Sequence, residues 1–347
     1  MIRLSILDQS IVPKGSTASE AIANTIRLVK WAETSGYHRF WVSEHHNSSM
    51  IAGSAPELLM VRLAHETSRI RIGSGGIMLP NHSALKVAEN FRLLETLYPG
   101  RIDLGMGRAP GGDQITALML NPSNNFQEAS YLQQLEHLQA FFHDEAATQY
   151  GPLLAVPQTA SVPDQWILSS SGGSASIAAK MGMGLAVARF INGFAGREIV
   201  EEYKKAFKPS RELESPKTLV AVSVLCADTV EKAGQLRKLA DYTLLQFEKG
   251  NFREMNRYED VQDYVFSPAE LERIRYNSGR IVSGTPEDVR EQLLQLAGDL
   301  DTSEIMVTSM THSQTDRFRS FELLAEVFGI SLSSSADTFS NLSVVHS

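Results

Sequence analysis

Residues 39–47, RFWVSEHHN, place a carboxylate and two imidazoles directly after a short apolar run. The apolar half is typical of a buried strand, and a surface turn would instead favour Gly, Asn or Asp at its end. Histidine titrates near neutral pH, so a strand that ends in Glu44, His45 and His46 could bring a proton donor or acceptor to a pocket. For His45 taken alone, a structural role is about as good an interpretation as a catalytic one.

The two adjacent histidines cannot serve one site together. Successive strand residues point to opposite faces, so either His45 or His46 can face a pocket, but not both. For the same reason the pair would rarely bind one metal ion, and we predict no metal site.

A second stretch, LSSSGGSAS at residues 168–176, combines hydroxyls and glycines immediately before a predicted helix. Free backbone N–H groups at a helix start, with the hydroxyls of Ser170, Ser171 and Ser174, could bind a phosphate or another anion. A serine cap on a glycine-rich turn is the alternative. Arg108, at the end of another predicted strand, could add a charge-assisted contact to a phosphate, although alone it is equally consistent with a salt bridge.

Other familiar motifs are incomplete in this sequence. GMGRAPGG at residues 105–112 has Pro110 where a dinucleotide fingerprint requires its third glycine. HETSR, which begins at His65, lacks the second histidine of a zinc-protease helix. Ser174 has no G-x-S-x-G context, and Cys226 lies in an apolar run where a small buried hydrophobe is expected.

Composition restricts the class of protein. The chain has 347 residues, 43% of them apolar, with one cysteine and a formal net charge of −8. The negative charge argues against a nucleic-acid partner, and no segment approaches the length of a membrane helix. The apolar stretch at the N-terminus is too short for a signal peptide, and a single cysteine fits a reducing compartment. We therefore expect a cytoplasmic protein with no membrane or nucleic-acid partner.

Apolar, β-branched runs alternate with amphipathic stretches of helix length, which predicts a parallel α/β sheet with right-handed crossovers. Eight such units is the count of the (β/α)8 TIM barrel, and a doubly wound open sheet is the alternative. The predicted strands are 2–7, 39–43, 70–79, 102–106, 165–169, 184–190, 218–226 and 304–309. The predicted helices are 18–34, 56–67, 84–97, 126–142, 174–181, 196–207, 229–247 and 318–328. Thr17 and Glu20 could form a capping box, and Thr285 and Pro286 are typical of a helix start.

A long polar and aromatic segment, 248–280, interrupts this alternation before the last strand and is interpreted as an insertion. Residues 1–330 are expected to form the barrel domain, and the Ser-rich residues 331–347 a disordered C-terminal tail. In such a barrel the functional groups lie at the carboxyl ends of the strands, where the Glu44–His46 and Arg108 regions and the serine loop all fall.

Taken together, these strand ends resemble the bacterial luciferase-like family of flavin-dependent monooxygenases. The resemblance extends from residue 2 to about residue 329 and depends on four stretches in the family's order. They are FWVSEHHN, the segment SRIRIGSGGIMLPNHS through GRIDLGMGRAPG, SSSGGSASIAAKMGMGLAVA, and GTPEDV with SEIMVTSMTHSQTDRFRSFELLAEV. It implies a barrel that holds FMN at the carboxyl ends of its strands, often as a homodimer.

By position, the resemblance implies a role for nine residues. His45 corresponds to the catalytic histidine, and Gly75 and Gly76 to a pair joined by a cis peptide beneath the flavin ring. Asn81 and His82 correspond to a loop near that ring. Arg108, Ser170, Ser171 and Ser174 correspond to residues around the FMN phosphate, although some luciferase subunits have Glu at the position of Ser170.

The resemblance implies a monooxygenase that uses reduced FMN and molecular oxygen to oxidise a small organic substrate. No nicotinamide fingerprint is visible, which favours a separate flavin reductase as the source of reduced FMN. The alternatives are a deazaflavin-dependent oxidoreductase of the same family and a flavin-binding protein without turnover.

Overall fold

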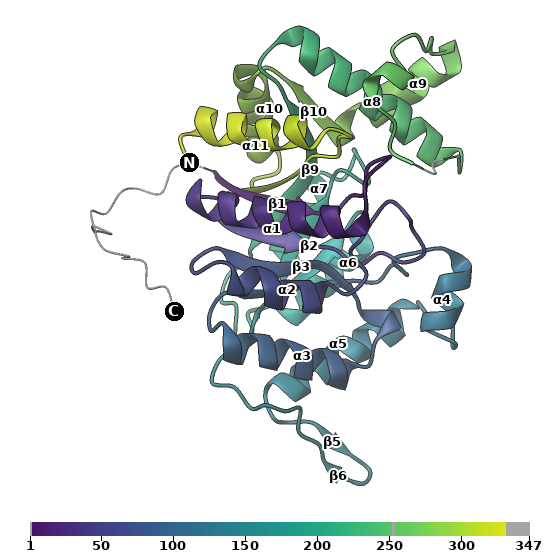
Figure 1. The fold of residues 1–347 in the computed structure, drawn as a ribbon. Coiled ribbons are helices and arrows are strands. Elements are labelled where there is room, and N and C mark those ends of the chain that lie inside the picture. Colours follow the sequence, from purple (N-terminus) through teal and green to yellow (C-terminus); the bar gives the residue numbers. More distant parts are fainter. Residues whose placement is uncertain (1, 252–253, 331–347) are drawn as a thin grey trace, which may run out of the picture.

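Eight parallel strands form a closed barrel in the computed structural model, which describes residues 2–251 and 254–330 (Figure 1). In order around the barrel, the strands are β1 (Arg3–Asp8), β2 (Arg39–Val42), β3 (Arg71–Met78), β4 (Ile102–Gly107), β7 (Asp164–Ser169), β8 (Gly184–Ala188), β9 (Thr218–Cys226) and β11 (Glu304–Thr308). Pairing of β8 with β9 and of β9 with β11 closes the ring. The predicted TIM barrel is therefore confirmed, and the open sheet is excluded.

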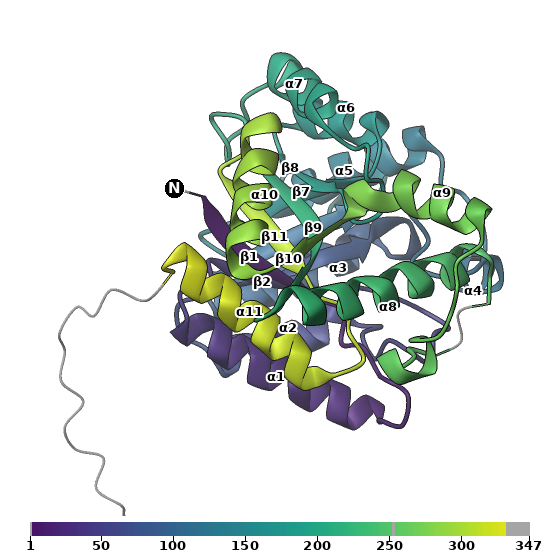
Figure 2. The ribbon, with the colours of Figure 1, turned by 90° about the horizontal axis from the view of Figure 1, so that it is seen from above.

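Helices surround the barrel, as the view from above shows (Figure 2). They are α1 (Ala18–Thr34), α2 (Pro56–His65), α3 (Ala84–Leu97), α4 (Gln114–Leu120), α5 (Glu128–Phe142), α6 (Gly172–Met181), α7 (Arg197–Ala206), α8 (Val230–Glu248), α9 (Pro268–Asn277), α10 (Pro286–Asp299) and α11 (Gln314–Phe328). The larger hydrophobic core lies between the strands and this ring of helices. None of the helices in the described residues is long and apolar enough to cross a membrane.

The inside of the barrel has its own small core. Trp41 and Trp166 meet there edge to face with their ring centroids 5.7 Å apart, and both are almost completely buried. Leu7, Ala186 and Met306 pack against them from other strands. These side chains fill the barrel interior toward the amino-terminal ends of the strands, so a ligand can enter only from the carboxyl ends.

Buried charges close the amino-terminal end of the barrel. The Arg39 guanidinium lies 2.6 Å from Asp103 Oδ2 and 2.6 Å from Glu304 Oε1, and all three side chains are almost completely buried. Burial acts to raise the pKa of Asp103, but Arg39 and Arg71 outweigh it and hold that pKa below its usual value. Three strands that start at distant points of the sequence are thus joined by a compensated ion cluster.

Helix caps follow the sequence signals. Thr17 caps α1 and Thr285 caps α10, and each forms a capping box, with Glu20 and Asp288 respectively. Pro286 is the first residue of α10, as expected.

The insertion before β11 contains more regular structure than we predicted. It includes the short 3-10 turns η2 (Tyr258–Asp260) and η3 (Ser278–Arg280) around α9. A ninth parallel strand, β10 (Ile281–Gly284), pairs with the carboxyl half of β9 and was missed in the sequence. The helices α4 and α9 were also absent from the predicted set, and of α10 only the start at Thr285 and Pro286 was predicted. The predicted disordered tail, 331–347, lies outside the described residues.

A small hairpin of β5 (Ala147–Thr148) and β6 (Gly151–Pro152) extends away from the barrel beyond α3 and α5 (Figure 1). It lies far from the carboxyl ends of the strands, so it takes no part in the site described below.

Candidate functional site

A cavity of about 490 Å³ lies at the carboxyl ends of the barrel strands. Its walls are largely apolar, with Leu7, Trp41 and Met306 from inside the barrel and Phe190 and Ile191 from the end of β8. Six of the nine residues singled out in the sequence line it: His45, Gly75, Arg108, Ser170, Ser171 and Ser174. Gly76, Asn81 and His82 are not in its lining.

Glu44 anchors the end of β2. Its buried carboxylate accepts hydrogen bonds from His46 Nε2 at 2.9 Å, His82 Nε2 at 2.9 Å and the Met78 backbone amide at 2.8 Å. Burial acts to raise the pKa of Glu44, but hydrogen bonds from His82 and His46 outweigh it and lower that pKa. The carboxylate therefore stays charged and joins β2 to the turn that follows β3.

Asn81 and His82 lie behind this carboxylate rather than on the cavity wall. Both belong to the turn around η1 (Leu79–Asn81), and both line a separate hollow of about 290 Å³. The Glu44 carboxylate raises the pKa of His82 against the opposing effect of burial. Both side chains therefore reach the cavity through Glu44, and Asn81 also donates to the carbonyl of the cavity residue Pro110 at 2.9 Å.

His45 faces the cavity, and His46 turns away to Glu44. Both histidines lie beyond β2, which ends at Val42, so strand alternation does not account for their opposite directions. His45 Nδ1 lies 3.1 Å from the Ser43 hydroxyl, and its backbone amide donates to the Gly53 carbonyl at 2.9 Å. Burial lowers the pKa of His45, so its imidazole is neutral at pH 7 and can accept a proton. The ring is thus held at the wall in a state suited to general base chemistry.

A cis peptide joins Gly75 and Gly76, as we predicted. A Cβ on Gly76 would lie 2.7 Å from the Gly105 carbonyl oxygen, and one on Gly75 would lie 2.9 Å from the Trp41 ring. Side chains are therefore excluded on both sides of this peptide. The result is bare backbone at the cavity wall, where a flat ring could lie close to it.

The start of α6 has the features of an anion cradle. Its N-cap residue, Ser171, makes no side-chain capping bond, so the first amides of the helix lack that partner. A Cβ on Gly172 would meet nothing within 4 Å, and one on Gly173 only a carboxylate oxygen of Glu128 at 3.8 Å. The protein's own packing therefore does not require these glycines, and they leave space for a ligand.

Arg108 completes this corner of the cavity. Its side chain extends from the loop after β4, is 32% exposed, and pairs with Glu128 at 3.3 Å. Asn192 Nδ2 donates to the Ser170 carbonyl at 2.9 Å, which fixes the serine loop. A phosphate group fits this corner, because amides, hydroxyls and a guanidinium converge where the chain leaves space.

Some residues of the cavity were not predicted. Met78 lies at the end of β3, and Phe126 comes from the irregular segment between α4 and α5. Met78 was hidden in an apolar run, and Phe126 gave no signal, because an aromatic residue before a helix is usually part of the core. Glu44 stood out in the sequence only as the neighbour of His45.

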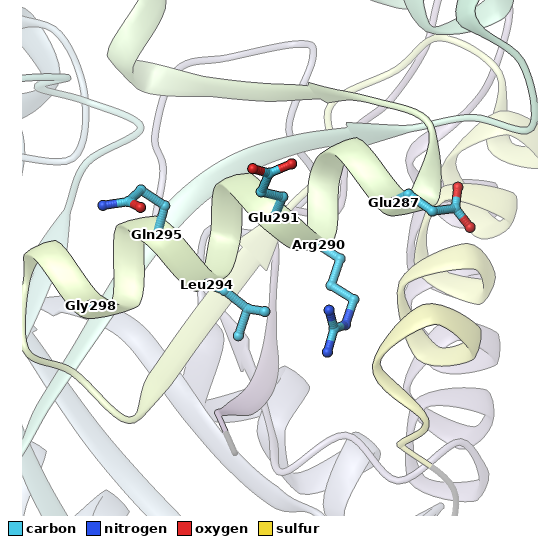
Figure 3. Close-up of a pocket in the computed structure, with 6 residues that line it drawn as sticks. All are labelled: Glu287, Arg290, Glu291, Leu294, Gln295 and Gly298. Carbon is cyan, nitrogen blue, oxygen red and sulfur yellow. The ribbon is translucent and has the colours of Figure 1, made fainter.

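Other hollows lack comparable chemistry. One lies on the outer face of α10, where Figure 3 shows its lining residues arranged along that single helix: Glu287, Arg290, Glu291, Leu294, Gln295 and Gly298. Another, of about 510 Å³, lies near the amino-terminal end of the barrel and is lined by paired charges such as Lys217 and Asp164. Within the described residues, no group of three or more His, Cys, Asp or Glu side chains is arranged to hold a metal ion.

Comparison with known proteins agrees with this geometry. The sequence profile of the luciferase-like monooxygenases matches residues 2–303. The chain belongs to the luciferase-like monooxygenase family. An N-acetyl-S-alkylcysteine monooxygenase of Bacillus subtilis is 37% identical over 94% of this chain and 98% of its own length. A luciferase-like monooxygenase of Escherichia coli K12 is 34% identical over 94% of this chain and 97% of its own length.

Solved structures share this fold. The apo crystal structure of MsnO8 superposes with a TM-score of 0.89 at 35% identity, covering 95% of this chain and 99% of that protein. The oxygenating component of 3,6-diketocamphane monooxygenase from Pseudomonas putida, solved with FMN, has a TM-score of 0.69 at 18% identity, covering 94% of this chain and 97% of that one. At that identity the likeness concerns the fold alone.

Proposed function

We propose that this protein is a monooxygenase that uses reduced FMN and molecular oxygen to oxidise a small organic substrate. The observation that carries the proposal is that one cavity is lined by the serine loop at the start of α6, by Gly75 of the cis peptide and by His45. These three parts match the phosphate, the ring and the reacting end of one FMN molecule.

Each part of the cavity has a separate task. Arg108, Ser170, Ser171 and Ser174 would bind the phosphate, and the Gly75–Gly76 peptide would support the ring. Reduced FMN, when bound, supplies two electrons to molecular oxygen, so that one oxygen atom enters the substrate and the other leaves as water. The apolar walls exclude bulk water, which favours a substrate with an apolar portion.

His45 is the proposed general acid–base residue. Its imidazole is neutral at pH 7, so it accepts a proton from the substrate side of the cavity and returns it as water forms. Because Nδ1 is engaged with the Ser43 hydroxyl, Nε2 would be the atom that exchanges this proton.

Asn81 and His82 would act by support rather than by contact with the ring. They hold Glu44, which precedes His45 and accepts the Met78 amide beside the glycine peptide. Positioning of a catalytic group through a second layer of hydrogen bonds is a common requirement of active sites.

Partners follow from the same proposal. A separate flavin reductase would supply reduced FMN, because the GMGRAPGG segment forms the end of β4 and a loop rather than a nicotinamide site. A homodimer is supported by exposed apolar side chains on α2 and α3, where Leu58 is 72% and Leu97 is 51% exposed. The single free cysteine is compatible with the cytoplasm.

Anaerobic titration followed by mixing with oxygen tests the proposal. The protein should bind reduced FMN, and when a substrate is present the oxygen consumed should appear in oxidised product and water rather than in hydrogen peroxide. Binding of a reduced deazaflavin in place of FMN, with hydride transfer and no oxygen consumption, would contradict it. Binding of FMN without any change in its reaction with oxygen would indicate a flavin-binding protein without turnover.

A further inference from the structure

Glu128 places a negative charge at the phosphate corner of the cavity. It is the first residue of α5, yet its Oε2 lies 3.3 Å from Arg108 and 3.8 Å from the position of a Cβ on Gly173. The carboxylate therefore stands beside the first turn of α6, a different helix. It pairs with the cation and lies beside the helix start that a flavin phosphate would use.

The charge balance of the cavity makes this carboxylate important. Among the described residues that line the cavity, Glu44 and Arg108 carry the only full charges, apart from any proton on His45. Glu44 is already compensated by His82 and His46. Arg108 is therefore the cation available to an incoming phosphate, and it is paired with Glu128.

We infer that Glu128 is a specificity-determining residue that competes with the flavin phosphate for Arg108 and the start of α6. This inference rests on the function proposed above, because it concerns the same phosphate corner. Phosphate binding displaces the carboxylate, which is 57% exposed and can rotate into solvent. No backbone movement is needed, since only side-chain torsions of Glu128 change.

Competition by a tethered carboxylate has two consequences. The affinity for any phosphate-bearing ligand is lower than Arg108 and α6 alone would give, because an existing charge pair must be broken first. Dissociation is faster for the same reason, because Glu128 can re-form its pair with Arg108 as the phosphate leaves. Fast dissociation is useful if FMN binds in its reduced form and must leave in its oxidised form in every catalytic cycle.

Removal of the carboxylate charge tests the inference. Glu128→Gln is compared with the natural protein and with Glu136→Gln, which removes the same charge from the exposed side of the same helix. Inorganic phosphate, oxidised FMN and riboflavin are titrated at constant ionic strength by calorimetry, and FMN dissociation is followed by stopped-flow fluorescence. The urea midpoint of each variant shows whether the fold is intact.

The expected pattern is selective. Glu128→Gln should bind phosphate and FMN roughly three- to tenfold more tightly, release FMN more slowly, and bind riboflavin as before. Glu136→Gln should match the natural protein with all three ligands.

Three results would overturn the inference. Weaker FMN binding by Glu128→Gln would mean that Glu128 orients Arg108 for the phosphate, and an equal change for FMN and riboflavin would mean that it contacts the sugar chain or the ring. Unchanged FMN binding by Glu128→Gln would also refute the inference. The proposed function would still stand if the protein prefers FMN to riboflavin and loses that preference when Arg108 is replaced. If no flavin binds to any variant, the proposed function itself fails.

Discussion

Glu44 and His82 form an ion pair, with 2.9 Å between Oε2 and Nε2, that joins the end of β2 to the turn after β3. The carboxylate is completely buried, and the imidazole is 29% exposed at a separate hollow. Glu44 is thus part of the cavity wall beside His45 and Met78, and His82 lies behind it. The strength of the Glu44–His82 pair should determine how rigidly the residues after β2 and β3 are positioned at the cavity.

The stabilising effect of this pair should depend on pH in a defined direction. The pKa of Glu44 is lowered from 4.5, so its contribution is lost as pH falls through the lowered value. The pKa of His82 is raised from 6.5, so its contribution is lost as pH rises through the raised value. A double-mutant cycle of Glu44→Gln and His82→Gln, measured by urea unfolding, should show a coupling of about 1–2 kcal/mol between pH 4.5 and 6.5. A coupling that stays constant from pH 4 to 9 would refute the ionic character of the pair.

Replacement of His45 should separate binding from turnover. His45→Ala should retain FMN affinity, because the phosphate corner lies on other strands, and lose about 100- to 10,000-fold in oxidation rate. His46→Ala is the control, since His46 contacts Glu44 rather than the cavity and should affect stability more than rate. Rates are compared per folded molecule, with the folded fraction taken from urea curves. A His45→Ala enzyme within a few-fold of normal would end the catalytic assignment and favour the flavin-binding alternative.

The glycine at the start of α6 should be dispensable for folding but needed for binding. Gly172→Ala places a methyl group in open space, so the free energy of unfolding should stay constant or rise by about 0.4–1 kcal/mol. The same methyl group should weaken FMN binding several-fold by entering the cradle. Gly234→Ala, also in a helix with nothing within 4 Å, should share the stability effect but leave binding unchanged. Equal FMN affinities for the two variants would show that the cradle does not hold the phosphate.

The ion cluster at the amino-terminal end of the barrel should be costly to break. Asp103→Asn leaves Arg39 partly uncompensated inside the protein and should lower the free energy of unfolding by about 3–5 kcal/mol. The surface pair of Lys30 and Glu66 offers a comparison, because Lys30→Ala should lower the free energy of unfolding by only about 0.2–1 kcal/mol. Chemical unfolding of both variants checks the contrast. Similar losses would show that burial does not govern these pairs.

The sequence predicted the elements whose signals are local. Helices 18–34 and 84–97 have the predicted boundaries, because each combines an amphipathic pattern with clear punctuation at its ends. The strand β10 was missed because four residues, IVSG, carry too little pattern to stand out after an irregular segment. A short strand of this kind is defined by its pairing with β9, which the local sequence does not encode.

The site was predictable where strand ends determine it. Barrel topology predicts that the Glu44–His46 region and Arg108 share one rim, since parallel strands bring their carboxyl ends together. The choice of His45 and Gly75 depended on the resemblance to the family. Asn81 and His82 could not be placed in this way, because the η1 turn carries them behind the Glu44 carboxylate. The Arg108–Glu128 pair was also invisible, since it joins two residues across an irregular segment.

The central claim is that the cavity binds FMN with its phosphate at Arg108 and the start of α6. The most direct test is the ratio of FMN to riboflavin affinity in the natural protein and in Arg108→Ala, measured by fluorescence titration. The natural protein should prefer FMN, and Arg108→Ala should lose about 1.5–3 kcal/mol of FMN binding while its riboflavin affinity stays the same. An FMN affinity that is unchanged in Arg108→Ala, or a loss of affinity equally large for riboflavin, would show that Arg108 does not bind the FMN phosphate.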